Sequence, residues 1–476
     1  MMLLVLVMVM AMVMALVDQI SQVLVNRWKN PLHLLRNLKV MAMVMFVSNV
    51  VKVPMVKARL RDFDLADAKA QAELAESRSA RDGARKAHAE AERALREIEL
   101  LLEGQWADGM VPHIVFRGEH DGYFPGPDVW STGQPIPTSG ITQPPVAGSV
   151  LRRLIETRVE VDQPRLATMV QRLGDWHAWF SVARQCPDTG AIVIIHPWES
   201  GRDNLSDWDK AMAAVIPDTG LGEYKRRDLE HVDASQRPTK EEYDRYLTLV
   251  RFGRDCNWDQ AHLGRNSPFR MLDPGMTAML LRAERDLIWL QTRVGQDISA
   301  TQARIRRLED GWRALWNPSV KGFTSLNQIT GEPGQAVSSA SFLGPYAGML
   351  DHLSETLDHF DRIAGRVKYM VPSFDPDAPG FDARRYWRGP VWYVVNNRIG
   401  LGLREIGELD RSERIRRDTA ALSEATGFSE YYDPLTGDGL GGTRFTWSAS
   451  VYLDWASEQA GAIASTAATA ATPGQG

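Results

Sequence analysis

The sequence predicts an all-α fold in which helical hairpins are arranged in a ring. Helical patterns alternate with long loops from Gly104 onward, and strand patterns are scarce, with residues 191–196 as the best candidate. The unusual residues, above all Trp, Gly, Pro and Asp, concentrate in the loops rather than on helix faces. Because connecting segments lie at the surface of a packed core, we expect the functional loops to gather at one end of the ring.

The expected helices follow from apolar residues at helical spacing and from the residue types at their starts. Pro390 is the natural first residue of one helix, and Asn204 or Ser206 is positioned to cap another. The predicted helices cover residues 146–157, 164–185, 205–215, 240–253, 274–294, 300–316, 390–407, 412–426 and 446–459.

A sharp change of composition near Gly104 divides the chain. We expect an atypical helical segment over residues 1–103, a helical domain over residues 104–460 and a flexible tail over residues 461–476.

The N-terminal segment begins with an apolar run over residues 1–17, which lacks the charged start and the cleavage site of a signal peptide. A second apolar patch, residues 40–51, has only about half of the ~20 residues that a membrane-spanning helix needs. The Ala-, Glu- and Arg-rich residues 65–102 predict one long helix or two.

Charge and cysteine content exclude several classes of protein. The 55 Lys and Arg residues face 60 Asp and Glu residues, a formal net charge of −5, so no basic field would gather nucleic acid. Cys186 and Cys256 are the only cysteines and lack metal-ligand spacing, which argues against a disulfide framework and a structural zinc site. We expect a small-molecule ligand, no metal or cofactor, and a cytoplasmic location. Membrane association through the basic, apolar residues 1–56 is the alternative, and a homo-oligomer is left open.

Tryptophan placement indicates a carbohydrate site. Of the 15 Trp residues, all but Trp28 lie at or beyond Trp106, and several are bunched with Gly, Pro, Asp and Arg. Flat indole faces stack on the apolar face of a sugar ring, while Asp, Glu, Arg and Asn bind its hydroxyls. Burial of each tryptophan in the core is the simpler alternative.

Three aromatic-rich loops carry the candidate chemistry. Residues 196–209 (HPWESGRDNLSDWD) contain Asp203, residues 429–442 (SEYYDPLTGDGLGG) contain Glu430, and residues 384–397 (RRYWRGPVWYVVNN) supply aromatic side chains. Glycoside hydrolysis needs one carboxyl group to protonate the leaving oxygen and another to activate water or attack carbon. A carboxyl beside tryptophans loses hydration and its pKa rises, which suits the acid. Sequence spacing alone does not select the pair.

Four motifs, HPWESGRDN, YWRGPVW, GFSEYYDPLTG and FTWSASVYLDW, resemble glycoside hydrolase family 63 and its bacterial relatives. Among these relatives the glucosylglycerate and mannosylglycerate hydrolases are most similar, with trehalases as more distant kin. The resemblance extends from about Gly104 to Trp455 and implies an (α/α)6 toroid. It also implies that Asp203, at the end of ESGRD, is the general acid and that Glu430, which opens EYYDP, is the general base. Such enzymes invert the anomeric carbon, so we expect the two carboxyls about 6.5–9.5 Å apart with a water between them.

The resemblance further implies residues that bind the sugar or its aglycone. Arg237, in QRPT, is the most informative, because a guanidinium pairs bidentately with a carboxylate and glycerate presents one. A structural ion pair with an acid such as Asp233 or Glu241 is the alternative for Arg237, and a place in the toroid core is the alternative for the tryptophans. The expected binding residues are Gln143, Trp198, Gly201, Arg237, Tyr386, Trp387 and Trp392.

We therefore expect hydrolysis of 2-O-α-glucosylglycerate to glucose and glycerate by single displacement. Mannosylglycerate, trehalose or another α-glucoside is the alternative substrate. One departure from the family supports a further alternative, a catalytically impaired carbohydrate-binding scaffold. Relatives carry an N-terminal Trp-Asp-Ser element that lines the sugar subsite, but nothing before Gly104 matches it, and Trp28 is followed by Lys29 and Asn30.

Overall fold

The computed structural model of the chain divides into two compact units. One unit comprises Met1–Met12 with Leu95–Gly476, and the other comprises Val13–Ala94. The structure describes residues 89–118, 123–157, 159–230 and 232–457.

Several predictions for the chain ends lie outside the described residues. They are the apolar segments at 1–17 and 40–51 and the tail at 461–476. Of the helix predicted at 65–102, the described part is helical over residues 89–103. Within the described part of the chain, no helix is both long and apolar enough to cross a bilayer. The domain boundary near Gly104 stays a prediction.

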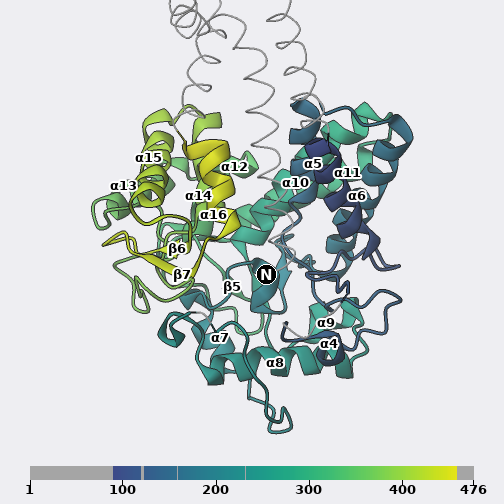
Figure 1. Cartoon of the computed structure of the whole chain (residues 1–476), viewed down its shortest axis with the longest axis horizontal. Helices are drawn as coiled ribbons and strands as arrows, with labels where there is room; N and C mark the ends of the chain where they lie inside the picture. Colours follow the sequence, from purple (N-terminus) through teal and green to yellow (C-terminus); the bar gives the residue numbers. More distant parts are fainter. Residues whose placement is uncertain (1–88, 119–122, 158, 231, 458–476) are drawn as a thin grey trace, which may run out of the picture. The chain divides into compact units, whose positions relative to one another are not determined.

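Helix α10 (Pro274–Arg293) organises one group of helices in the larger unit. It is buried along most of its length and packs against α5 (Ala147–Glu156), α6 (Gln163–Ala183) and α11 (Ser299–Ala314) (Figure 1). Asp273 caps α10, because its side chain accepts hydrogen bonds from the first free backbone amides of the helix.

Helix α14 (Tyr393–Glu405) organises the second group. It packs against α12 (Gly344–Ala347), α15 (Leu409–Thr426) and α16 (Thr446–Val451), and α13 (Leu353–Ala364) lies in the same region (Figure 1). Helix α12 also contacts α10 and so connects the two groups.

Further helices, single helical turns and short strands make up the rest of the larger unit. Figure 1 shows α4 (Pro127–Trp130), α7 (Asp209–Ala213), α8 (Lys240–Asp255) and α9 (Gln260–Asn266) at one end of the helical groups. Single turns of 3-10 helix are η2 (Pro197–Ser200), η3 (Ser206–Trp208), η4 (Ala234–Gln236) and η5 (Ser339–Phe342), and residues Tyr452–Ala456 form a π-helical turn.

Strands β1 (Val193–Ile194), β2 (Met271–Leu272) and β5 (Leu326–Asn327) form an antiparallel sheet in the order β1-β2-β5. Two antiparallel pairs are β3 (Trp316–Asn317) with β4 (Gly322–Phe323), and β6 (Ser429–Tyr432) with β7 (Gly439–Thr443). Because these strands are so short, the prediction of an all-α fold is confirmed.

The helix predicted over residues 390–407 starts later than expected. Val391 exchanges backbone hydrogen bonds with Tyr432 in both directions, at 2.8 and 3.1 Å, which keeps it extended. The helix therefore begins at Tyr393, and the prediction that Pro390 is its first residue is wrong.

The predicted helix at 205–215 is also interrupted, since η3 precedes the short α7. The predicted caps are wrong: no side chain caps either element. The Ser206 hydroxyl instead donates to the Gly380 carbonyl at 2.7 Å, and Asn204 adopts a left-handed conformation with a φ of 66°.

The remaining predicted helices are confirmed within a few residues, except that 446–459 is α-helical only to Val451. Of the strand predicted at 191–196, only β1 is formed. Helices α4, α9, α12 and α13 were not predicted from the sequence.

Candidate active site

One cavity collects side chains from segments that lie far apart in the sequence. Its volume is about 1330 Å³, including the part open to solvent. Every site residue predicted from the sequence lines it: Asp203, Glu430, Gln143, Trp198, Gly201, Arg237, Tyr386, Trp387 and Trp392. The structure brings these residues together, while their individual roles stay predictions.

Asp203 lies in a tight turn between η2 and η3. Gly201, at the end of η2, has a φ of 67°, a left-handed conformation that glycine adopts without steric cost. Asn204 is held from two sides, because Arg388 Nε donates to its Oδ1 at 3.2 Å and its Nδ2 donates to Glu242 Oε1 at 3.0 Å. These contacts fix the backbone directly after Asp203 at the cavity wall.

The surroundings of Asp203 suit a general acid. Burial raises the pKa of its carboxyl to about 6, and a hydrogen bond with Tyr386 and the charge of Arg237 only partly offset that effect. A carboxyl with this pKa retains its proton at mildly acidic pH, where an exposed aspartate is ionised.

We expect kcat/KM to fall as the pH rises through about 6, because only the protonated Asp203 can donate to a leaving oxygen. The alkaline limb of a pH profile, measured with a substrate that has a poor leaving group, tests this. A glycosyl fluoride, whose leaving group needs little protonation, should keep its rate above that pH. A flat profile between about pH 5 and pH 8 for the poor leaving group would contradict the acid role.

Glu430 lies on strand β6, whereas the sequence suggested a loop. Arg237 binds both carboxylate oxygens, since Nη1 donates to Oε1 at 3.2 Å and Nη2 donates to Oε2. The Gly442 amide donates to Oε2 at 3.1 Å. A carboxylate has about four lone-pair positions, so these contacts orient Glu430 and leave room to accept a proton from water.

Arg237 forms a buried ion pair with an acid, as the structural alternative expected, but not with Asp233 or Glu241. Asp233 caps η4 by accepting a hydrogen bond from the Ser235 amide, and Glu241 pairs with Arg245. The partner of Arg237 is instead the predicted general base, Glu430.

The Arg237 guanidinium is enclosed by aromatic rings. It lies 4.6 Å from the ring centre of Tyr386 and 5.8 Å from that of Tyr431. Burial is the largest single effect on the pKa of Arg237 and lowers it, but the charge of Glu430, its hydrogen bonds with Arg237 and the neighbouring Tyr386 and Tyr431 together outweigh burial and raise that pKa above its usual value. The positive charge beside Glu430 is therefore permanent.

The two tryptophans of the YWRGPVW motif form the wall of the cavity. Trp387 stacks on Trp392 with ring centres 4.0 Å apart and planes within 6°, and Trp392 stacks on Tyr431 at 4.7 Å. Both tryptophans are buried. They line the cavity and also pack in the core, so the two readings made from the sequence are compatible.

Several residues that line the cavity were not predicted from the sequence. Trp447 belongs to the FTWSASVYLDW motif, which was used only as a sign of the family. Tyr243 and Tyr246 lie one turn apart on α8, a spacing that could have been noticed. The other lining residues, including His113, Tyr123, Phe124, Trp130, Arg227 and Asp228, carried no pattern that singles them out.

Three buried polar atoms in the cavity have no hydrogen-bond partner among the described residues. They are Gln143 Oε1, Arg237 Nε and Trp447 Nε1. A buried donor or acceptor without a partner costs free energy, so these atoms indicate where a polar ligand would bind. Over the same described ranges, no group of three or more His, Cys, Asp or Glu side chains is arranged to hold a metal ion.

Comparison with known proteins identifies relatives of the chain. The family model of the mannosylglycerate hydrolase MGH1-like glycoside hydrolase domain matches residues 82–448. The chain is 43% identical over 372 residues to a mannosylglycerate hydrolase of Thermus thermophilus. This match covers 76% of this chain and 89% of that protein. It is 34% identical over 394 residues to a glucosylglycerate hydrolase of Mycolicibacterium hassiacum. This match covers 76% of this chain and 87% of that protein.

A solved structure agrees with these matches. The crystal structure of a family 63 mannosylglycerate hydrolase from Thermus thermophilus, in complex with Tris and D-glycerate, matches with a TM-score of 0.74 and 42% identity. The match covers 78% of this chain and 90% of that one. Structures of family 63 are (α/α)6 toroids, so the prediction of a toroid is confirmed. This chain belongs to the mannosylglycerate hydrolase MGH1-like glycoside hydrolases of family 63.

Proposed function

We propose that this chain is an inverting hydrolase of α-linked glycosides of glycerate, with Asp203 as general acid and Glu430 as general base. The cavity carries this proposal, because a carboxyl with a raised pKa and a carboxylate bound to a guanidinium line the same space. Two carboxyl groups in such different surroundings are what the acid and base roles require.

In the proposed reaction, the Asp203 carboxyl donates its proton to the glycosidic oxygen while the bond from that oxygen to the anomeric carbon breaks. Glu430 takes a proton from a water that attacks the opposite face of the same carbon. The products are the free sugar, with inverted configuration, and glycerate. Asp203 ends ionised and Glu430 ends protonated, and proton exchange with solvent restores both.

Arg237 is the proposed site for the glycerate carboxylate. A guanidinium presents five N–H groups in one plane, and the Nη1 and Nη2 end of Arg237 is bound to Glu430. A substrate carboxylate along the Nε edge would give the buried Nε the partner that it lacks among the described residues. The charge of Arg237 also acts on Asp203, which supports a place for the carboxylate near the oxygen that Asp203 protonates.

The sugar is the second part of the substrate. The sequence favoured glucosylglycerate, with mannosylglycerate as an alternative. Identity is higher to the mannosylglycerate hydrolases of Thermus thermophilus and Selaginella moellendorffii, at 43% and 42%, than to the glucosylglycerate hydrolase, at 34%, while the mannosylglycerate hydrolase of Rubrobacter radiotolerans is 32% identical. This difference favours mannosylglycerate, and a substrate panel decides between them.

The panel contains mannosylglycerate, glucosylglycerate, trehalose and methyl α-glucoside. We expect release of reducing sugar from the glycerate glycosides in preference to the two neutral compounds. Preference for trehalose would remove glycerate from the proposal. Turnover of none of them, with binding retained in calorimetry, would instead favour the carbohydrate-binding scaffold.

The stereochemistry gives a separate prediction. Proton NMR at early times should detect the β-anomer of the sugar released from an α-linked substrate, before mutarotation mixes the anomers. The α-anomer as first product would mean retention of configuration, and Glu430 would then not act as a base on water.

A further inference from the structure

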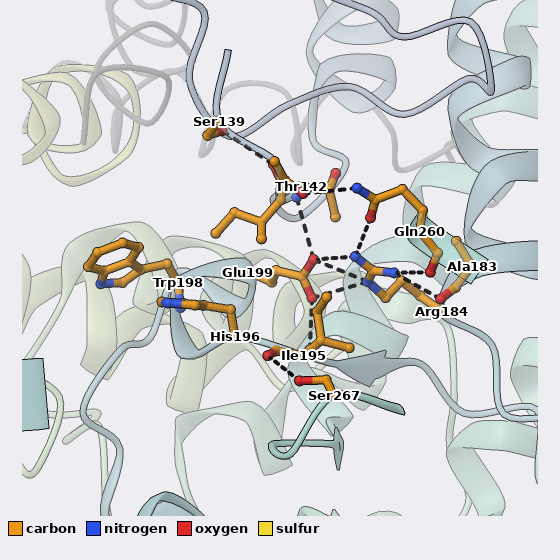
Figure 2. Close-up of polar contacts among 12 residues, drawn as sticks. Ser139, Thr142, Ala183, Arg184, Ile195, His196, Trp198, Glu199, Gln260 and Ser267 are labelled. Atoms are coloured by element: carbon orange, nitrogen blue, oxygen red, sulfur yellow. Dashed lines mark hydrogen bonds and ion pairs between the residues drawn. The ribbon is translucent and has the colours of Figure 1, made fainter. Parts of the chain in front are cut away.

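A buried ion pair joins Arg184 to Glu199 (Figure 2), which lies in η2, just before Asp203 in the sequence. Both side chains are fully buried. Arg184 Nη2 donates to Glu199 Oε1 at 2.9 Å, and the Ile195 amide donates to Glu199 Oε2 at 2.9 Å. A buried pair is a weak source of stability, because desolvation offsets the attraction of the charges. What such a pair does provide is a fixed geometry.

Arg184 ties this pair to the helices. It is the C-cap residue that directly follows α6, and its Nη2 also donates to Gln260 Oε1, at the start of α9, at 2.7 Å. Gln260 in turn donates to the Gly140 carbonyl at 3.0 Å. Figure 2 shows the guanidinium between Glu199 and Gln260. Glu199 is thus anchored to two helices.

Glu199 also meets the loop that supplies Gln143. The Thr142 amide points at Glu199 Oε1 at 3.5 Å, the limit of a hydrogen bond (Figure 2). One residue further on, Gln143 Nε2 donates to the Trp198 carbonyl at 2.9 Å, next to Glu199 in η2. The carboxylate therefore sits where the Gln143 loop and the Asp203 loop approach each other.

We propose that Glu199 is a positioning residue, which sets the placement of Asp203 and Gln143 by holding their two loops against α6 and α9. Glu199 does not line the cavity, so it acts only through the backbone of η2 and of the neighbouring loop. Its partner Arg184 orients the carboxylate through hydrogen bonds to both of its oxygens.

The chain offers a matched control in Glu284. This carboxylate is also fully buried, and it is bound by Arg304, whose Nη2 donates to Oε2 at 3.0 Å. His177 lies 3.4 Å away. Glu284 joins α10 to α6 and α11, and it does not line the cavity. It therefore shares the chemistry of Glu199 without its place beside the site loops.

The test compares Glu199→Gln with Glu284→Gln in the full-length protein, well below the unfolding temperature of each. We expect both changes to lower thermal stability. Only Glu199→Gln should lower kcat/KM for mannosylglycerate, by about ten- to hundredfold, because an error of ~1 Å in placement costs rate. Looser packing would hydrate Asp203 and lower its pKa toward the usual value, so the alkaline limb should move by about half a pH unit or more to lower pH.

Two readouts decide the proposal. An unshifted alkaline limb and an unchanged kcat/KM in folded Glu199→Gln would overturn it and leave Glu199 as a stability element. If Glu199→Gln does not fold, Arg184→Lys takes its place with the same expectations, and failure of both to fold, while Glu284→Gln folds, also overturns the proposal.

Hydrogen–deuterium exchange separates this inference from the proposed function, on which its kinetic readout rests. Glu199→Gln should speed amide exchange in peptides that cover residues 139–145 and 195–204, and Glu284→Gln should not. This holds even if the unmodified protein hydrolyses none of the panel. Equal exchange in both variants overturns the positioning role, whereas loss of activity in the unmodified protein concerns only the proposed function.

Discussion

Replacing Asp203 by Asn should lower kcat/KM for mannosylglycerate by about 10²- to 10⁴-fold, the usual contribution of a general acid. Asn keeps the shape of the side chain but has no acidic proton for the glycosidic oxygen. Hydrolysis of α-mannosyl fluoride should stay within about tenfold of the unmodified protein, because fluoride leaves without full protonation. Steady-state kinetics on the two substrates near pH 5.5, where about half or more of Asp203 is protonated, measure the difference.

Asp207 provides the control for this variant. It lies in the same loop, and burial likewise raises its pKa to about 6. It accepts a hydrogen bond from the Ser325 amide at 3.1 Å and does not line the cavity. Asp207→Asn should therefore affect the two substrates equally. A selective loss on mannosylglycerate in Asp207→Asn would mean that Asp207, and not Asp203, is the general acid. Equal losses on the two substrates in Asp203→Asn would exclude the acid role of Asp203.

Long helices could be predicted from the sequence because several signals agree on each. Helix α10 combines an Asp cap, Pro at its start and apolar residues over five turns, and α8 begins with a capping box at Thr239. Helices α4 and α12 have only four residues each, too few for any periodicity to appear. The start of α14 depends on the pairing of Val391 with Tyr432, which no local pattern reveals.

The sequence predicts residues that the structure places around one cavity, but it does not predict their contacts. Motifs identify Asp203, Glu430 and Arg237, but the ion pair of Arg237 with Glu430 joins residues 193 positions apart. The acids expected to pair with Arg237, such as Asp233 and Glu241, are its neighbours in the sequence, because a single sequence indicates contacts mainly through local spacing. Tertiary packing brings Trp447 into the cavity, and it also brings Glu199 next to the loop that contains Gln143. Neither arrangement is visible in the sequence.

The contact of Arg237 with Glu430 changes what Arg237→Lys is expected to do. Lysine keeps the charge but loses the planar fork, so Glu430 retains at most one of the two bonds that orient it. A charge-assisted hydrogen bond contributes about 1.5–3 kcal/mol, which corresponds to roughly ten- to hundredfold in rate. This loss should fall on every substrate, including α-mannosyl fluoride, because each needs the base to activate water.

A second loss should fall on the glycerate glycoside alone. If its carboxylate binds along the Nε edge, lysine removes that contact too, so mannosylglycerate should drop a further ten- to hundredfold or so below the fluoride. Arg227→Lys is the control, since Arg227 lines the same cavity but pairs with Glu230 at 2.8 Å. Equal losses on both substrates in Arg237→Lys would leave Arg237 as a partner of the base only. A selective loss on mannosylglycerate in Arg227→Lys would place the glycerate carboxylate at Arg227 instead. The planar guanidinium of Arg227, which lysine lacks, would then be the group that binds that carboxylate.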